Sequence, residues 1–209
     1  MPSKITTKTL AAAVAELAAR DKDFARLYER HGAPPLRARA AGFATLLKII
    51  CAQQVSTASA RAIVGRLQGA ADPLTPRTLL ALDATALKAI GFSRMKAAYG
   101  RGLAEAILDG GLDLGVVARM DDEAAIAELV RVKGIGRWSA EMYLLFALRR
   151  PDLWPIGDLA VVKGVQRLKG LAGRPRPAAM TAYGEAWRPW RSVAARMLWH
   201  SGGNTPPDA

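Results

Sequence analysis

The sequence contains few of the side chains that hold transition metals. Among its 209 residues there are one cysteine, Cys51, and two histidines. These counts exclude an iron–sulfur cluster held by four cysteines, and any zinc site that this chain builds alone from cysteine and histidine. A single cysteine forms no disulfide within the chain, which suits a reducing compartment. Cys51 ends the mostly apolar run 46–51, so we predict a buried structural thiol.

Long apolar stretches are also absent. No run reaches the eighteen or so residues that a helix needs to cross a bilayer. The N-terminal segment carries Lys4 and Lys8 but no secretory apolar core, and we interpret it as the start of the first helix. We therefore expect neither membrane insertion nor secretion, but a cytoplasmic protein, associated with the nucleoid if it is bacterial.

Alternating runs of β-branched residues, which are typical of strands, are missing, whereas Ala, Leu and Arg dominate. Clusters of proline and glycine separate short helical segments without any long linker. The sequence therefore predicts an all-α fold with no N-terminal β domain. The expected helices span residues 8–20, 22–31, 42–68 (broken near Gln53–Ser56), 75–81, 83–89, 94–109, 121–131, 137–149, 158–170, 178–185 and 189–200.

Negative charge is scarce relative to positive charge. Lys and Arg number 30 against 18 Asp and Glu, which gives a net charge of +12 and a pI near 10.4. Hydrophobic residues make up 51% of the chain, enough for a substantial core. A compact protein this basic favours a polyanionic partner, most often nucleic acid. A generally basic surface with no such partner is the alternative.

The segment 129–138, Leu-Val-Arg-Val-Lys-Gly-Ile-Gly-Arg-Trp, predicts a helix, a tight glycine turn and a second helix. Gly134 and Gly136 leave the rim of the turn without side chains. Backbone N–H groups at the start of the second helix can therefore lie directly against a phosphate. Such a contact binds nucleic acid without reading its sequence. Taken alone, the pattern favours an ordinary turn between helices, and the net charge and the residues downstream are what favour a phosphate contact.

Asp158 follows the breaker-rich segment 154–157 and precedes an apolar helical run, which is an N-cap position. Capping alone explains it. A carboxylate fixed there also suits a cleft in which a positive sugar transition state needs stabilisation.

Tryptophans and amides give two further candidates. Trp187 and Trp190 are expected in the core, whereas Trp138 follows the turn directly and is placed to stack on an extruded base. Gln53 and Gln54 are adjacent amides within an apolar stretch. They indicate either a polar break between helices or a side chain that enters the duplex where a base has left.

Four stretches occur in the following order: 50–56 (Ile-Cys-Ala-Gln-Gln-Val-Ser), 134–140 (Gly-Ile-Gly-Arg-Trp-Ser-Ala), 155–159 (Pro-Ile-Gly-Asp-Leu) and 188–199, which begins Arg-Pro-Trp-Arg-Ser. Together they resemble the helix-hairpin-helix (HhH-GPD) DNA glycosylase superfamily, most closely its alkylbase branch of the DNA-3-methyladenine glycosylase II type. The resemblance implies a single domain of two lobes with the active cleft between them. One lobe would span about 42–150, including the hairpin 132–136, and the other about 1–40 plus 158–202.

The resemblance also implies roles for individual residues. Asp158 matches the catalytic carboxylate, and Gln54 matches the side chain that inserts into the duplex, with Gln53 beside it. Trp138 and Trp199 match aromatic residues of the base pocket. Met142 stands where bacterial relatives have a pocket tyrosine, and Tyr143 follows it. The DNA-binding hairpin would comprise Lys133, Gly134, Ile135, Gly136 and Arg137, with a monovalent cation, Na⁺ or K⁺, on the main-chain carbonyls of Val130, Val132 and Ile135.

Members of the family that also cut the sugar–phosphate backbone carry a nucleophilic lysine where this chain has Trp138. No Schiff base can form from that position, so we predict a monofunctional hydrolase without lyase activity. The expected substrate is double-stranded DNA with alkylated purines of the 3-methyladenine and 7-methylguanine type. The alternatives are a glycosylase for uracil, mismatched or oxidised bases, and a non-catalytic protein that binds damaged DNA. We expect a monomer that requires no cofactor.

Overall fold

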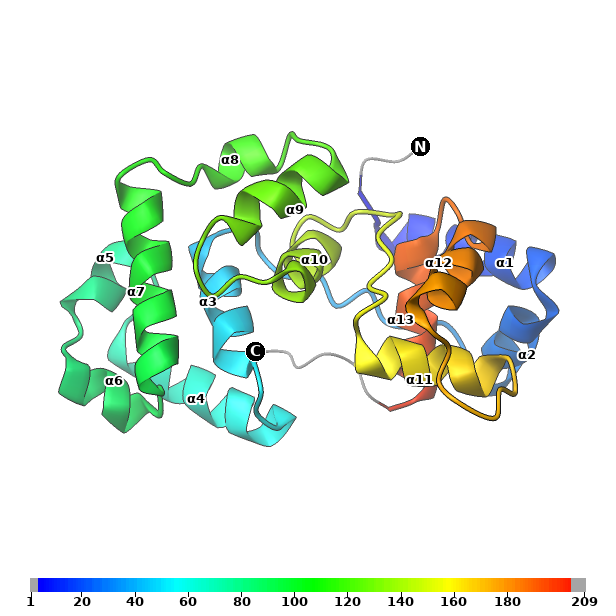
Figure 1. Ribbon diagram of the computed structural model, residues 1–209, viewed down its shortest axis with the longest axis horizontal. Helices are drawn as coiled ribbons and strands as arrows, with labels where there is room; N and C mark the ends of the chain where they lie inside the picture. The colour runs from blue at the N-terminus through cyan, green and yellow to red at the C-terminus, as the bar shows by residue number, and fades with distance from the viewer. Residues whose placement is uncertain (1–3, 204–209) are drawn as a thin grey trace. The chain divides into compact units, whose positions relative to one another are not determined.

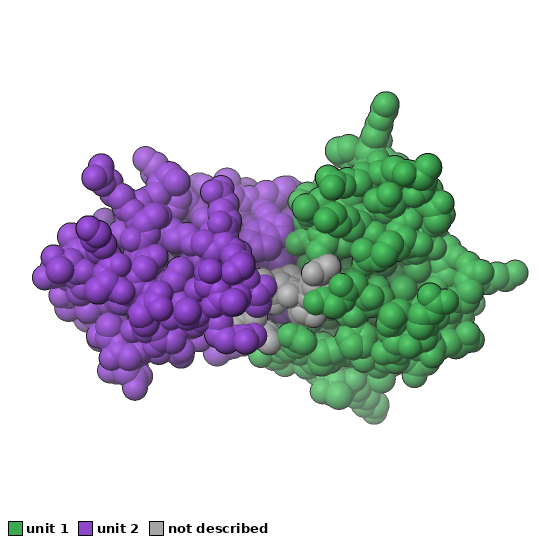
Figure 2. Space-filling view, turned by 90° about the horizontal axis from the view of Figure 1, so that it is seen from below, with its two compact units in different colours: residues 1–38, 149–206 green, residues 39–148, 207–209 purple. Residues whose placement is uncertain are grey.

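The computed structural model describes residues 4–203, and every regular element in that range is a helix (Figure 1). This confirms the predicted all-α fold. The chain divides into two compact units, shown in green and purple in Figure 2. Of the described residues, unit 1 comprises 4–38 and 149–203, and unit 2 comprises 39–148. No helix in the described part of the chain is both long and apolar enough to cross a membrane.

Unit 1 combines the first two helices of the chain with the last three. Its core lies where α13 packs against α1, α2 and α11, and residues 192–199 of α13 are all buried. Trp187 and Trp190 are 1% and 9% exposed, which confirms their predicted place in the core. The helices are α1 (Thr7–Arg20), α2 (Lys22–His31), α11 (Leu159–Leu168), α12 (Pro177–Ala186) and α13 (Arg191–Ser201).

Trp187 organises this core. Its ring meets Phe24 and Trp154 edge-on, with 5.0 Å between ring centroids in each pair. Its indole N–H donates to Asp21 Oδ2 at 3.0 Å, and Lys169 Nζ donates to the same oxygen at 3.0 Å. Burial raises the pKa of Asp21, but the bonds from Trp187 and Lys169 outweigh burial and lower it overall. The network thus fixes the start of α2 against the C-terminal end of α11.

Unit 2 is built around α3 and α10, which pack on each other and are buried over most of their length. Ser, Thr or Asp N-caps begin six of its helices, each with a side-chain oxygen that accepts an N–H of the first turn. The helices are α3 (Phe43–Ala52), α4 (Thr57–Ala70), α5 (Pro76–Ala81), α6 (Ala84–Ile90), α7 (Arg94–Leu108), α8 (Leu114–Val117), α9 (Asp122–Val130) and α10 (Arg137–Phe146).

The expected helix at 42–68 is two helices, and the gap between α3 and α4 confirms the predicted break at Gln53–Ser56. Cys51 is 0% exposed, which confirms the buried thiol, and burial raises its pKa to about 12. The four-residue helix α8 is absent from the prediction, because so short a segment shows no apolar periodicity. Helix α10 ends at Phe146 rather than at residue 149, where Arg149 takes a φ of +58° that no helix continues.

Candidate functional site

Asp158 is the N-cap of α11, as predicted. Its Oδ1 accepts the backbone N–H of Val161 at 2.9 Å, three residues into the helix. The preceding turn is closed by a hydrogen bond from Asp158 N to Pro155 O at 3.0 Å. The residue is 6% exposed. A carboxylate this restricted has one orientation, which the helix start imposes.

A second donor reaches the same oxygen. The indole N–H of Trp199, on α13, donates to Asp158 Oδ1 at 3.0 Å. Helices α11 and α13 approach closely at Gly164, where a Cβ would lie 2.8 Å from Leu198 Cβ. Trp199 is 1% exposed, so it lies beneath the carboxylate rather than on an open surface. The structure thus places the predicted pocket residue Trp199 against the predicted catalytic residue, and it shows Trp199 as a support for that carboxylate.

The glycine turn between α9 and α10 belongs to unit 2. Gly134 has a φ of +97°, and Ile135 N donates to Val132 O at 3.0 Å to close the turn. A Cβ on Gly134 would lie 2.2 Å from the ring of Tyr99 on α7. Gly136 is the N-cap of α10 with an ordinary φ of −86° and open space at its Cβ position. The first glycine is therefore required by conformation and packing, whereas the second keeps the helix start accessible.

The two adjacent amides have different surroundings. Gln53 Nε2 donates to Gly134 O and to Ser139 Oγ, each at 2.9 Å. Its amide therefore braces the hairpin within unit 2, a role that the sequence did not predict. Gln53 also lines the groove beside the hairpin, and its direct contact with DNA stays a prediction. Gln54 is exposed and has a φ of +54°, in the left-handed region. This strained conformation presents the Gln54 side chain at the surface, as its predicted role demands.

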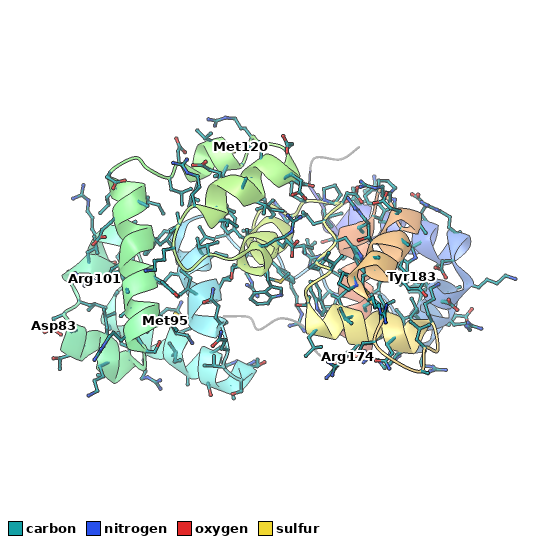
Figure 3. The ribbon with its side chains drawn as sticks, viewed as in Figure 1. Asp83, Met95, Arg101, Met120, Arg174 and Tyr183 are labelled. Atoms are coloured by element: carbon teal, nitrogen blue, oxygen red, sulfur yellow. The ribbon has the colours of Figure 1, made fainter. Side chains whose placement is uncertain are left out.

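A groove of about 870 Å³ brings the hairpin, both glutamines and Trp138 together. Trp138 is half-buried on its wall, and Lys133 is exposed at its edge. The groove also has an apolar lining, in which Met95 and Val130 are 59% and 42% exposed. Met95 lies in the first turn of α7 (Figure 3). The arrangement suits a ligand with both a charged backbone and flat apolar parts.

Two predicted pocket residues are absent from this groove. Met142 and Tyr143 are 1% and 0% exposed on the buried part of α10. The Tyr143 hydroxyl accepts the backbone N–H of Gly42 at 3.0 Å, and burial raises the pKa of this phenol. The structure gives Tyr143 a bond that ties the segment before α3 to α10. Met142 and Tyr143 are thus packing residues of unit 2, a correction to the expected base pocket.

Arg137 forms ion pairs that the sequence did not predict. Its terminal nitrogens donate to both carboxylate oxygens of Glu123 at 2.9 and 2.6 Å, and Nε donates to Glu141 at 3.0 Å. The hydrogen bonds that Arg137 donates to Glu123 raise the pKa of Arg137, against the smaller effect of burial. These bonds join α10 to α9, and the contact of Arg137 with a DNA phosphate stays a prediction.

Three residues of the hairpin region escaped the sequence analysis. Tyr99 packs on Gly134, Ser139 accepts from Gln53, and Lys96 Nζ donates to Cys51 O at 2.7 Å. Ser139 lies within the stretch 134–140, but that pattern does not reveal its bond to Gln53. Tyr99 and Lys96 lie outside the four stretches, and only the fold brings α7 to the hairpin. Among residues 4–203, no cluster of three or more His, Cys, Asp or Glu side chains is suited to a metal ion.

Comparison with known proteins gives a consistent picture. Residues 47–190 match the model of the "HhH-GPD superfamily base excision DNA repair protein". The chain is 32% identical over 158 residues to DNA-3-methyladenine glycosylase 1 of Schizosaccharomyces pombe, covering 74% of this chain and 69% of that protein. It is 29% identical to the putative DNA-3-methyladenine glycosylase YfjP of Bacillus subtilis, covering 84% of this chain and 64% of that protein. It therefore spans just under two thirds of the YfjP sequence.

The fold is also similar to solved structures. The structure of Schizosaccharomyces pombe 3-methyladenine DNA glycosylase (Mag1) in complex with abasic DNA matches with a TM-score of 0.83. The identity is 30%, and the match covers 90% of this chain and 95% of that chain. A DNA-3-methyladenine glycosidase of Bacillus halodurans matches with a TM-score of 0.79 at 31% identity, covering 91% and 89%.

Proposed function

Because this chain belongs to the HhH-GPD superfamily of base excision DNA repair proteins, we propose that it is a monofunctional DNA glycosylase for alkylated purines. Its substrate would be double-stranded DNA carrying bases of the 3-methyladenine and 7-methylguanine type. The similarity to 3-methyladenine glycosylases over most of the chain supports the substrate class. The observation that carries the proposal is the carboxylate of Asp158, oriented by the Val161 N–H and the Trp199 indole.

The proposed reaction is a hydrolysis. The bond between C1′ of the sugar and the base nitrogen breaks, and its electron pair leaves with the base. The Asp158 carboxylate stabilises the positive charge that develops on the sugar and orients the water that attacks C1′. The water loses a proton to the carboxylate or to solvent, and the products are a free base and an abasic site. An alkylated purine already carries positive charge, so it leaves without strong acid catalysis.

In this proposal unit 2 binds the DNA. Backbone N–H groups at the uncapped start of α10 contact a phosphate across Gly136, and Lys133 adds a positive charge. Gln54 fills the gap in the base stack when the damaged nucleotide swings out, which costs a few kcal/mol. The face of Trp138 attracts the cationic base, an interaction worth roughly 0.5–2 kcal/mol. Since Trp138 is not a nucleophile, no covalent enzyme–DNA intermediate forms.

We further propose that the hairpin binds Na⁺ or K⁺ through the carbonyls of Val130, Val132 and Ile135. The residues are compatible with this: Val132 O accepts the Ile135 N–H and keeps a second lone pair for the ion. The ion would add positive charge near a DNA phosphate, while the residues of the chain carry out the hydrolysis. We propose that the protein acts as a monomer on cytoplasmic DNA.

The test is base release from methylated duplex DNA, with the freed bases identified by mass spectrometry. Wild type should release 3-methyladenine. Asp158→Asn should abolish release and leave DNA binding equal or tighter, because asparagine still caps the helix but lacks the charge. The matched control is Asp83→Asn, which makes the same change at the N-cap of α6.

Release by the control but not by Asp158→Asn would establish the reaction and its catalytic residue together. Retained release by Asp158→Asn would overturn the role of the carboxylate. Loss of both binding and release in that variant would mean that Asp158 only caps α11.

A further inference from the structure

The positive charge of the chain is concentrated in the unit that lacks the hairpin. Among the described residues, unit 1 carries 17 Lys and Arg against 7 Asp and Glu, a net charge of +10. Unit 2 carries 13 against 10, a net charge of +3. The hairpin therefore accounts for little of the basic character that points to a polyanion. Most of the net positive charge therefore lies in unit 1.

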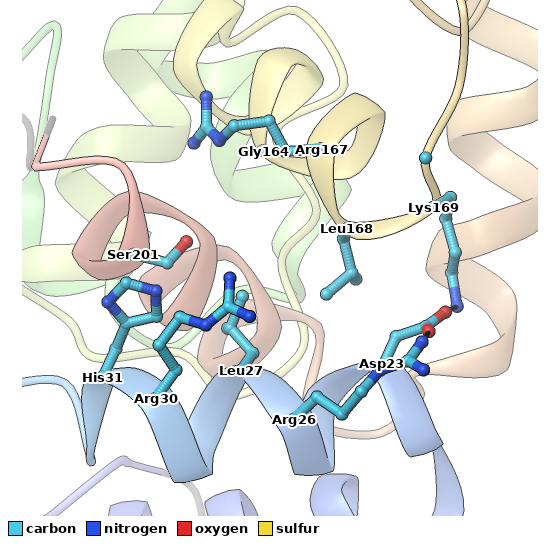
Figure 4. Close-up of a pocket in the computed structure, with 11 residues that line it drawn as sticks. Asp23, Arg26, Leu27, Arg30, His31, Gly164, Arg167, Leu168, Lys169 and Ser201 are labelled. Atoms are coloured by element: carbon cyan, nitrogen blue, oxygen red, sulfur yellow. Dashed lines mark hydrogen bonds and ion pairs between the residues drawn. The ribbon is translucent and has the colours of Figure 1, made fainter.

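Helices α2, α11 and α13 enclose a surface that carries part of this charge. A pocket of about 640 Å³ is lined by Arg30 and His31 from α2, Arg167 from α11 and Ser201 from α13 (Figure 4). Arg167 reaches the end of α13, where a Cβ on Gly202 would lie 2.5 Å from its terminal nitrogen. Cations from α2 and α11, which are distant in sequence, thus converge on one opening beside the end of α13.

Among the described residues, the only carboxylate that lines this pocket is Asp23, and it is already bound. Asp23 accepts a hydrogen bond from Lys169 Nζ at 2.6 Å and forms an ion pair with Arg26. The bond from Lys169 is the main reason that the pKa of Asp23 lies below its usual value. Neither Arg30 nor Arg167 forms an ion pair with any residue in the described range 4–203, and both are exposed. Two guanidinium groups are therefore available to an anion.

The pocket continues into a second groove along α11. That groove is lined by Lys163, Gln166, Arg167 and, in the loop after α11, Arg174, and no carboxylate of residues 4–203 lines it. Arg167 and Gly170 line both hollows, so the two form one surface. Figure 3 shows Arg174 beside α11. We call the surface formed by Arg30, Lys163, Arg167 and Arg174 the basic face.

The cations of the basic face repel one another, and a bound anion would reduce this repulsion. Lys163 and Arg167 are four residues apart on one face of α11, where like charges repel. Asp158 starts the same helix nine residues before Arg167, about 14 Å along its axis and about the length of four DNA base pairs. A small anion would neutralise only one end of the basic face, whereas a chain of DNA phosphates is long enough to neutralise all of it.

We propose that the basic face binds backbone phosphates of duplex DNA as a second contact, separate from the hairpin. The inference rests on the proposed function and extends it. Arginine forks bind phosphate oxygens in pairs. The Gln166 amide donates one N–H to Leu171 O at 3.4 Å, and its second N–H adds a neutral donor. Contacts of this kind read no sequence, so they hold damaged and undamaged duplex equally.

The test compares two double variants in duplex binding at several salt concentrations. Arg167→Gln with Arg174→Gln removes two cations from the basic face. Lys8→Gln with Lys22→Gln removes two exposed cations of unit 1 outside both hollows and is the matched control. Each lost phosphate contact lowers the slope of log affinity against log salt by about 0.9. Between about 50 and 200 mM salt, the affinity of the basic-face variant should therefore fall about 12-fold less than that of wild type.

The control should keep the wild-type slope, and both variants should keep single-turnover base release at saturating enzyme. Equal slope changes in the two double variants would overturn the basic face in favour of diffuse charge. A lowered melting temperature with an unchanged slope would assign Arg167 to the end of α13 alone. If millimolar inorganic phosphate competes with DNA only in proteins with an intact basic face, then the natural ligand of this face is a small anion rather than DNA. A wild type without DNA binding or base release would instead overturn the proposed function itself.

Discussion

The distinctive features of unit 1 are side-chain charges and hydrogen bonds, whereas those of unit 2 lie in the backbone. In unit 1, Asp158 accepts hydrogen bonds from two N–H donors, and the described residues carry a net charge of +10. In unit 2, the net charge is small, and the distinctive features lie in the backbone: an uncapped helix start at Gly136 and left-handed residues at Gly134 and Gln54. Binding by the backbone needs little net charge, because helix N–H groups act as fixed partial charges.

The positive net charge of the sequence does not by itself locate the hairpin. The segment most typical of DNA binding lies in the nearly neutral unit. One of its basic residues, Arg137, forms ion pairs with Glu123 and Glu141 of the same unit. The two units also differ in what shapes their functional parts. Side-chain hydrogen bonds orient the carboxylate of unit 1, whereas backbone conformation and packing shape the hairpin of unit 2.

The largest expected effect is on stability, when each of the two hairpin glycines is replaced by alanine. Gly134→Ala should destabilise the protein strongly, because alanine is strained at a φ of +97° and its Cβ would overlap the Tyr99 ring. Strain and overpacking each cost about 1–3 kcal/mol. Gly136→Ala should change the free energy of unfolding by less than about 0.5 kcal/mol, since its φ is ordinary and its Cβ position is open.

Urea unfolding with duplex-binding measurements checks this pair. Gly136→Ala should keep its stability and weaken binding to all DNA sequences alike, because a methyl group stands where a phosphate approaches. Normal stability of Gly134→Ala would contradict the packing argument, and normal binding by Gly136→Ala would contradict the phosphate contact.

The next effect is on rate in unit 1. Trp199→Phe removes one of the two N–H donors to Asp158 Oδ1 and keeps most of the buried ring. A hydrogen bond to a charged group contributes about 1.5–3 kcal/mol, so base release should slow about 10- to 100-fold. Since Trp199 acts through Asp158, kcat should fall while the affinity for DNA is kept.

Trp190→Phe is the matched control for that variant. It removes an indole bond to Glu16 Oε2 of 2.6 Å elsewhere in unit 1. Both variants should lose similar stability, and only Trp199→Phe should lose rate. Equal rates in the two variants would show that the Trp199 bond is structural and does not tune the carboxylate.

Sequence reasoning recovered what local patterns encode. Caps, breakers and helical spacing predicted the all-α fold, the break at Gln53–Ser56 and the N-cap at Asp158, which the structure confirms. The family resemblance is confirmed by the match over residues 47–190. These features depend on residues that lie near one another in the chain.

Sequence reasoning did not find the partners that distant parts of the chain supply. Arg137 reads as a phosphate ligand in a basic hairpin, and Glu123, fourteen residues away, accepts two of its hydrogen bonds. Gln53 reads as a companion of Gln54, yet it bonds Gly134, eighty-one residues away. Tyr143 turns into the core because its hydroxyl finds Gly42. Only the folded chain brings such partners together, so no local pattern announces them.

The smallest effect sharpens the contrast between stability and function in unit 2. Gln54 has a φ of +54°, a conformation that costs a non-glycine residue roughly 1–2 kcal/mol. Gln54→Gly should therefore stabilise the protein by up to about 1 kcal/mol, less the extra flexibility of glycine in the unfolded chain. It should also slow base release, since no side chain is left to occupy the gap in the stack. Gln54→Asn is the control, because asparagine tolerates the left-handed region and keeps an amide. Thermal unfolding and single-turnover release, measured on all three proteins, decide the matter. A glycine variant that is both more stable and fully active would show that the Gln54 side chain has no part in opening the duplex.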